Sequence, residues 1–263
     1  MSGSALRLEG ASFSYGAVEV LRELWLDVRA GEFVAIVGPS GCGKTTLLNL
    51  LSGNLQPSVG KVIRAGRTRT VYQQDGLFPW LTVSENIGMG LREIAAPPER
   101  KRLLADLIQL IRLEGFEGHY PHQLSGGMKQ RVELARALAG DAEILLMDEP
   151  FSALDYQTRL RMRRELGRLL HERPRTVIFV THDIEEAAQL ADRVAVLTAR
   201  PACISRELTL DVPRPRPMTH PSVIEATEQI LEEMGLRDEE DGAAALDKPF
   251  SLSGSEKVLG RRA

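Results

Sequence analysis

The stretch GPSGCGKTT at residues 38–46 constrains the fold of this chain more than any other feature. It matches the phosphate-loop pattern G-x-x-x-x-G-K-[ST], and it lies between an apolar strand-like run and a predicted helix. Gly38, Gly41 and Gly43 allow the backbone to curve so that its N–H groups point inward at phosphate oxygens. The N-terminus of the following helix adds partial positive charge. We therefore predict that the chain binds a nucleoside triphosphate.

Two side chains of this phosphate loop have predicted roles. Lys44 is expected to reach the β- and γ-phosphates, and Thr45 is expected to place its hydroxyl on a Mg²⁺ ion. The alternative is a glycine-rich turn with a chance lysine, and the flanking strand and helix argue against it. The predicted nucleotide contacts comprise the whole loop: Gly38, Pro39, Ser40, Gly41, Cys42, Gly43, Lys44, Thr45 and Thr46.

Strand-like apolar runs recur with helical segments between them, which predicts an α/β fold of the P-loop NTPase kind with a mainly parallel core sheet. The opening segment alternates apolar and polar residues, so we expect an N-terminal antiparallel β-subdomain. An ATPase domain is predicted over 5–210, with an inserted helical subdomain at about 83–139. A proline-rich linker and a short helix are expected at 211–236, and a disordered tail at 237–263.

Charge and composition exclude several classes of protein. The net charge of −3 argues against nucleic acid as the main partner, and the arginine-rich stretch 158–168 is interpreted as a solvated helix face. One of the two cysteines, Cys42, lies inside the phosphate loop, so no structural disulfide is expected and a reducing compartment fits. No secretory signal and no bilayer-spanning apolar run are recognisable, so other chains must supply any membrane-spanning part.

A second group of polar residues follows two apolar strands. ILLMDEP at 144–150 should deliver Asp148 to the carboxyl edge of the sheet as a Mg²⁺ ligand, with Glu149 beside it as general base for an attacking water. An acidic turn after a strand is the alternative. His182, in IFVTHD, is expected to contact the γ-phosphate and align the water with Glu149, although a lone histidine there is more often structural.

Two further candidates lie earlier in the chain. Gln73, at the end of another strand, is a candidate Mg²⁺ ligand and sensor of the triphosphate, with Gln74 as its competitor and a solvated glutamine as the alternative. Tyr15 is placed to stack on the adenine ring, and the alternative is a half-buried tyrosine of a strand.

The stretch LSGGMKQR at 124–131, the signature stretch, raises a separate question. Ser125, Gly126 and Gly127 directly precede an amphipathic helix and therefore predict a second anion site at a helix N-terminus. The chain's own triphosphate is already enclosed by the phosphate loop and the two carboxylates. A second anion site would have a function if it bound the triphosphate held by another copy of the chain.

The motifs together resemble those of ATP-binding cassette (ABC) ATPases. The phosphate loop, the glutamine near 73, the signature stretch, ILLMDEP, SALD at 152–155 and THD at 181–183 stand in that family's order over about residues 5–210. The resemblance implies ATP and Mg²⁺ as ligands and two cassettes stacked head to tail, with two ATP molecules between phosphate loop and signature stretch. It also implies that Asp155 works across that interface and that Tyr15 and Val20 pack on adenine.

Within the family, a single cassette without a fused membrane segment is similar to the ATPases of bacterial importers. QQDGLFPW at 73–80 and the PRPR-type ending at 213–217 resemble the nitrate, sulfonate and taurine group. This resemblance implies permease subunits docked near 73–80 and the helical subdomain, a separate substrate-binding protein, and a peripheral position on the cytoplasmic face of the inner membrane. The exposed apolar residues expected at the docking surface are Leu77, Phe78, Pro79 and Trp80. The short segment between Gly60 and Gln73 departs from the family pattern and predicts a trimmed antiparallel subdomain.

Three other functions are compatible with parts of the pattern. A cassette ATPase of DNA maintenance would carry a long heptad-bearing insertion, which this sequence lacks. A small-molecule P-loop kinase would not need Glu149, His182 or the signature stretch. The ATPase of an ABC exporter shares all of this chemistry and differs only in its membrane partner, so it remains the main alternative.

Overall fold

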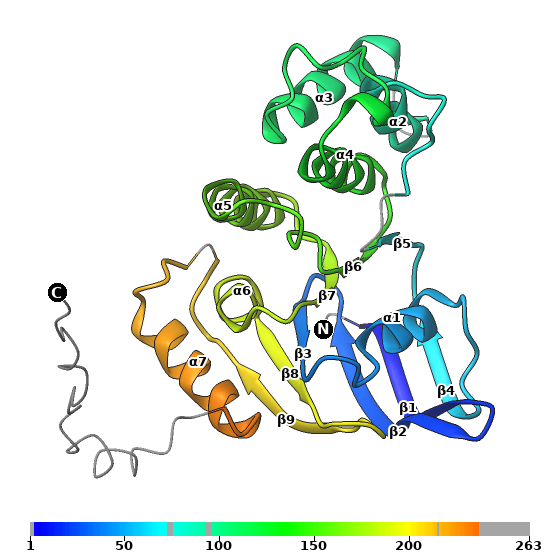
Figure 1. Cartoon of the computed structure of the whole chain (residues 1–263), viewed down its shortest axis with the longest axis vertical. Helices are drawn as coiled ribbons and strands as arrows, with labels where there is room; N and C mark the ends of the chain where they lie inside the picture. The colour runs from blue at the N-terminus through cyan, green and yellow to red at the C-terminus, as the bar shows by residue number, and fades with distance from the viewer. Residues whose placement is uncertain (1–2, 73–75, 93–95, 215, 237–263) are drawn as a thin grey trace, which may run out of the picture.

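The computed structural model describes residues 3–72, 76–92, 96–214 and 216–236, and Figure 1 shows their arrangement. The strands are β1 Ser4–Tyr15, β2 Val18–Arg29, β3 Phe33–Val37, β4 Val59–Arg64, β5 Thr68–Val71, β6 Ile144–Asp148, β7 Thr176–Val180, β8 Arg193–Leu197 and β9 Ile204–Thr209. The helices are α1 Lys44–Ser52, α2 Val83–Gly88, α3 Pro97–Leu110, α4 Gly126–Ala139, α5 Tyr156–Glu172, α6 Ile184–Leu190 and α7 Pro221–Glu233, with 3₁₀ turns η1 Met89–Leu91 and η2 Pro121–Gln123. Among the helices of these described ranges, none is long and apolar enough to cross a membrane.

The core is a six-stranded sheet with the strand order β5-β6-β7-β3-β8-β9. The first five strands of this order are parallel, and β9 pairs antiparallel with β8 at the edge. This arrangement confirms the predicted α/β class with a mainly parallel sheet. The strand order places β3, β7 and β6 side by side, which matters because each ends in a predicted site motif.

Strand β3 is buried on both faces, which explains why its sequence is a continuous apolar run rather than an alternating one. Phe33, Ala35 and Val37 belong to the core that α4, α5 and α6 cover. The intervening residues Val34 and Ile36 belong to a second core, formed with α1 and the N-terminal strands. The two cores sandwich the sheet, so the end of β3 is fixed from both sides.

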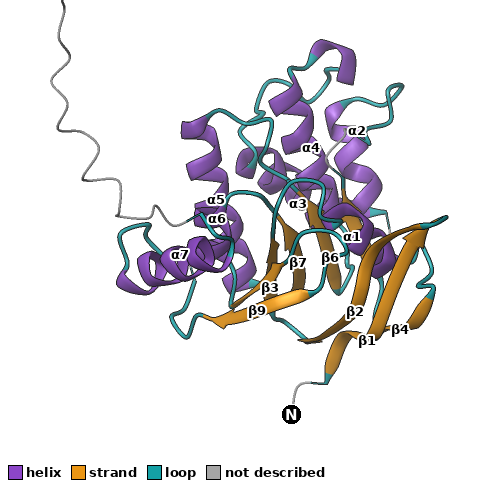
Figure 2. Ribbon diagram, turned by 60° about the horizontal axis from the view of Figure 1, so that its bottom comes forward, coloured by secondary structure: helices purple, strands orange, loops and turns teal. Residues whose placement is uncertain are grey.

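The N-terminal segment forms a separate antiparallel sheet with the order β2-β1-β4, as its alternating sequence predicted (Figure 2). Leu6, Leu8 and Leu26 on its inner face join the core around α1. Arg7 and Asp27 pair on the opposite face at 3.2 Å. This sheet therefore has one dry and one wet face, and it carries Tyr15 at the end of β1.

Helices α2, α3 and α4 form a lobe beyond the β5–β6 end of the core sheet (Figure 1). In α2, Thr82 and Glu85 form a capping box that defines the N-terminus of the helix. The apolar stripe of α3 is only partly covered: Ile108 is 5% exposed, whereas Leu103, Leu104 and Leu107 are half-buried. The lobe therefore leaves apolar side chains of α3 accessible.

The proline-rich segment after β9 is attached to the core through Arg216, whose side chain is fully buried. The Arg216 guanidinium donates to the carbonyl oxygens of Ala191 (2.6 Å) and Leu210 (3.0 Å), and its Nε donates to Val212 O (2.6 Å). Helix α7 then packs against α6 and β9 through Val223, Ala226 and Ile230. This attachment reaches the C-terminal end of α6, a helix that begins beside the predicted histidine.

Arg216→Met keeps most of the side-chain length but removes every donor, which leaves buried carbonyl groups without partners. We expect the free energy of unfolding to fall by about 3 kcal/mol, measured by denaturant titration without nucleotide. Arg164→Met, on the exposed face of α5, is the control and should change it by no more than about 0.5 kcal/mol. Equal losses in the two variants would show that the Arg216 hydrogen bonds do not hold the segment.

Candidate active site

The phosphate loop joins β3 to α1 and has a backbone that requires glycine. Gly41 and Gly43 have φ values of 72° and 121°, in the region that side chains disfavour. A Cβ atom on Gly43 would lie 2.8 Å from Cγ1 of Val20 and 3.0 Å from Cδ2 of Leu21. Strand β2 therefore supports the loop from below, and any larger residue at position 43 would displace it.

Lys44, the first residue of α1, is buried and folded back over the phosphate loop. Its Nζ donates to the carbonyl oxygens of Gly38 (2.8 Å) and Pro39 (2.9 Å). The N-terminus of the nine-residue helix α1 has no side-chain cap, because the N-cap residue is Gly43. Free backbone N–H groups and an ammonium group thus converge where a phosphate group is expected to bind.

The predicted acidic residues lie at the same edge of the sheet as the phosphate loop. Strand β6 pairs with β7, and β7 pairs with β3, all in parallel, so their carboxyl ends meet there. Asp148 is 2% exposed and accepts a hydrogen bond from the side chain of Thr45. Two oxygen groups suited to Mg²⁺, a carboxylate and a hydroxyl, are therefore in direct contact.

Burial raises the pKa of the Asp148 carboxyl above its usual value, and the neighbouring charge of Glu149 adds to this effect. The hydrogen bond from Thr45 and the charge of Lys44 act in the opposite direction without cancelling it. The ionised form of Asp148 is therefore held at a cost to the folded protein until a cation compensates it.

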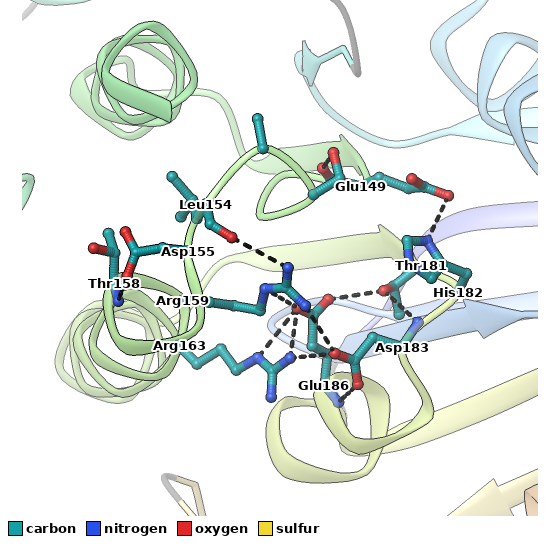
Figure 3. Close-up of polar contacts among 12 residues, drawn as sticks. Glu149, Leu154, Asp155, Thr158, Arg159, Arg163, Thr181, His182, Asp183 and Glu186 are labelled. Carbon is teal, nitrogen blue, oxygen red and sulfur yellow. Dashed lines mark hydrogen bonds and ion pairs between the residues drawn. The ribbon is translucent and has the colours of Figure 1, made fainter. Parts of the chain in front are cut away.

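Glu149 and His182 contact each other across the β6–β7 pair, as Figure 3 shows. Nδ1 of His182 lies 3.0 Å from Oε1 of Glu149, and the His182 side chain is 62% exposed. The backbone of Glu149 has a φ of 47°, which is rare for a residue with a side chain. The chain therefore leaves the extended conformation of β6 directly after Asp148. The pair thus offers a carboxylate and an imidazole together at an open edge of the site.

The signature stretch lies elsewhere in the molecule. Ser125 is the N-cap of α4, and its Oγ accepts from the backbone N–H of Met128 at 3.3 Å. Ser125 and Gly126 are exposed, and Gly127 lies under the loop that contains Ala153. In Figure 1, α4 lies in the helical lobe, whereas α1 lies on the other side of β5 and β6. The two predicted phosphate-binding sites, the phosphate loop and the signature stretch, therefore do not meet within one copy of the chain.

Gln130, near the end of the signature stretch, has a role that the sequence did not indicate. Its Nε2 donates to the carbonyl oxygen of Glu149 (3.0 Å), and its Oε1 accepts from the backbone N–H of Ala153 (3.0 Å). It is 4% exposed. Helix α4 is thereby bonded to the loop that follows the predicted general base.

Glu133, one helical turn farther along α4, holds both sides of the predicted glutamine segment. Its carboxylate accepts from the backbone N–H groups of Tyr72 (3.3 Å) and Gly76 (3.2 Å). Gln73 and Gln74 themselves lie outside the described residues, so their proposed roles stay predictions. The contacts of Glu133 nonetheless tie the two ends of that segment to α4.

The remaining predicted nucleotide contacts lie in three places. Tyr15 is 53% exposed, and its ring meets Phe13 edge to face with centroids 4.9 Å apart. Val20 is buried under Gly43, which is a supporting position as well as a candidate adenine contact. Asp155 is exposed and caps α5 by accepting from the backbone N–H of Thr158 at 3.0 Å.

Two expectations about surfaces were wrong in part. Leu77 is 9% exposed and Phe78 is half-buried beneath the Arg136 guanidinium, so of the four expected docking residues only Pro79 and Trp80 are exposed. The arginine-rich stretch of α5 is not a uniformly solvated face, because Arg163 is 3% exposed and paired with Glu186 at 2.7 Å. Burial in both places depends on neighbouring elements that are distant in sequence. Both cysteine thiols, those of Cys42 and Cys203, are free.

Asp148→Asn is expected to raise the melting temperature of the nucleotide-free protein at neutral pH by a few degrees. The raised pKa means that the folded state binds the Asp148 proton more tightly than the unfolded state, so this group lowers stability as the pH rises above about 4. The advantage of the variant should therefore be full near neutral pH and shrink as the pH falls toward about 4.

The measurement is thermal unfolding in a chelating buffer across that pH range, with Asp106→Asn on the exposed face of α3 as control. A variant less stable than the parent at neutral pH would contradict the inferred cost of burying this charge.

Comparison with known proteins agrees with this site. A protein-family model described as ABC transporter matches residues 21–152. An uncharacterized ABC transporter ATP-binding protein from Methanocaldococcus jannaschii is 45% identical over 228 residues, which cover 83% of this chain and 85% of the relative. The aliphatic sulfonates import ATP-binding protein SsuB from Bacillus licheniformis is 41% identical over 239 residues, covering 87% of this chain and 93% of the relative.

Solved structures give the same result. The dimeric structure of a bacterial ABC transporter cassette matches with a TM-score of 0.71 at 33% identity and covers 79% of this chain and 99% of that one. A post-hydrolysis state of an ATP-binding cassette bound to ADP and Pi matches with a TM-score of 0.69 at 33% identity, with the same coverage of both chains. These matches agree with the phosphate loop and with Asp148 and Glu149 at the carboxyl end of β6. The chain therefore belongs to the ABC transporter family and is one of its ATP-hydrolysing subunits.

Proposed function

We propose that this chain powers an importer by closing with a second copy, head to tail, on two ATP molecules. The observation that carries the pairing is the separation of the phosphate loop from the signature stretch within one chain. The exposed N-terminus of α4, with Ser125 and Gly126, would then complete the site of the partner copy. One of the matched structures is itself a dimer of a bacterial ABC transporter cassette, which supports this arrangement.

The importer assignment rests on relatives. Proteins named for import of aliphatic sulfonates, nitrate, and spermidine or putrescine are 41%, 43% and 43% identical to this chain over the matched regions. The nitrate relative, from Synechococcus elongatus, is matched over 32% of its own length, whereas the sulfonate relative is matched over 93%. We propose a small solute of the nitrate, sulfonate or taurine class, delivered by a separate binding protein to permease subunits at the cytoplasmic face of the inner membrane.

Hydrolysis in this proposal uses the groups at the sheet edge. Lys44 and the N–H groups at the start of α1 hold the phosphates, and Glu149 accepts a proton from the attacking water. His182, in contact with Glu149, keeps the carboxylate and the water aligned with the γ-phosphate. Mg²⁺, held by Thr45 and Asp148, would offset phosphate charge and compensate the buried carboxylate. Loss of the γ-phosphate removes the contact that joins the two copies, so the closed pair is no longer favoured.

A groove between the helical lobe and α5 is the proposed permease contact. Its volume is about 950 Å³, and its lining combines apolar side chains of α3, α4 and α5 with charged side chains at the rim. The apolar lining comprises Leu91, Leu103, Leu107, Leu110, Leu138, Ala139, Leu169 and Leu170. A groove of this composition suits an amphipathic helix of a partner better than it suits open water.

Glu149→Gln should keep ATP binding and stop turnover, because the amide cannot accept the proton of the water. We expect kcat for ATP hydrolysis to fall by about 10²-fold or more, and ATP to drive accumulation of a dimer detectable by size-exclusion chromatography. Glu172→Gln, at the exposed end of α5, is the control and should hydrolyse ATP normally. Normal turnover by Glu149→Gln would remove Glu149 from its proposed role.

The transport proposal is tested by purifying the tagged chain from gently solubilised membranes of its host and identifying bound proteins by mass spectrometry. We expect a permease, recovered with a solute-binding protein. Leu107→Glu should reduce permease recovery by about tenfold, because a charge in the groove opposes burial of a helix. Ala105→Glu, on the same helix but outside the groove lining, should not. Recovery of soluble partners or DNA alone would contradict the importer assignment and leave the ATPase assignment intact.

A further inference from the structure

Arg159 of α5 connects the loop 152–155 with the loop 181–183 (Figure 3). Nη2 of Arg159 donates to the carbonyl oxygen of Leu154 at 3.2 Å, the residue before Asp155. Nη1 of the same guanidinium lies 3.6 Å from Oδ2 of Asp183, the residue after His182. One side chain therefore contacts the loop 152–155 and the loop 181–183 at the same time.

Arg163 lies one turn farther along α5 and anchors the base of this connection. Its Nη2 donates to Oε1 of Glu186 at 2.7 Å and also bonds Oδ2 of Asp183. Glu186 in turn accepts from Oγ1 of Thr181 at 2.8 Å. Burial raises the pKa of the Glu186 carboxyl even beside Arg163, so burying these charges is costly and stability alone does not account for the cluster.

Thr181 and Asp183, the neighbours of His182, are hydrogen-bonded within this cluster. The His182 imidazole instead contacts Glu149. The backbone N–H of Asp183 donates to Oγ1 of Thr181 at 3.0 Å, and Oδ1 of Asp183 accepts from the backbone N–H of Glu186 at 3.0 Å. A cavity of about 10 Å³ lies between Arg159, Glu149 and His182, which is room for roughly one water molecule. The Arg159 side chain therefore borders a small space on the side that faces His182, which leaves room for a small shift.

We propose that Arg159 is a positioning residue that couples the loop 152–155 to His182. Displacement of that loop, which ends at Asp155, pulls on the Leu154 carbonyl and through Arg159 on Asp183, and so changes where the His182 ring stands relative to Glu149. The proposal rests on the proposed roles of Glu149 and His182 in hydrolysis. It adds that the position of His182 depends on the loop 152–155 of the same chain, through the contacts of Arg159.

The first test compares Arg159→Gln with Arg159→Lys and with the control Arg161→Gln, an exposed arginine on the same helix. We expect Arg159→Gln to lower kcat for ATP hydrolysis about tenfold while KM for ATP changes less than about twofold, because binding groups are untouched. Arg159→Lys should recover part of the rate, since a cation can still pair with Asp183. A rate equal to that of Arg161→Gln, or a loss that lysine does not relieve and that follows the melting temperature, would overturn the proposal.

The second test asks whether Arg159 acts through His182. In a double-mutant cycle, Arg159→Gln combined with His182→Ala should be no slower than His182→Ala alone, because the positioned group is already absent. Multiplicative losses would show that Arg159 acts independently and would overturn the coupling. If His182→Ala and Glu149→Gln each turn over normally, the proposed catalytic roles fail instead, which separates the two failures.

Discussion

The parallel pairing of β3, β7 and β6 is the constraint on which the rest of the site depends. Each strand is buried on both faces, and each ends at the same edge of the sheet. The phosphate loop, Asp148 and His182 therefore meet without any direct bond being needed to gather them. The backbone N–H of Glu149 donates to Val180 O at 2.9 Å, which extends the β6–β7 pairing by one residue into the site.

Helix α4 connects the helical lobe to this edge through two side chains. Gln130 bonds the loop after Glu149, and Glu133 bonds residues on either side of the predicted glutamine segment. Both are almost fully buried, so their hydrogen bonds are expensive to break. The helix that begins with the signature stretch is thereby hydrogen-bonded to the loop after Glu149 and to Tyr72 and Gly76.

Several of these groups lower the stability of the fold in which they stand. Asp148 carries a charge that burial disfavours, Glu149 has a backbone conformation that few residues adopt, and Arg163 and Glu186 bury an ion pair. The sheet that holds them compensates through apolar burial on both faces. Local rules are broken at the site and obeyed around it, which is the usual distribution in a functional protein.

The α/β class, the phosphate loop, the carboxylate pair and the histidine could be predicted from the sequence alone, because each is a local pattern that depends only on its immediate neighbours. The sequence also indicated the start of α4, through Ser125. The polar side chains that connect these parts could be identified only in the folded structure. Gln130 and Glu133 bond groups that are 19 and 61 residues away along the chain. The contacts of Arg159 and Arg216 likewise form only when the helices and loops pack together. A single glutamine or arginine on a helix has the same local pattern whether it is solvated or bonded, so its role follows from the assembled fold.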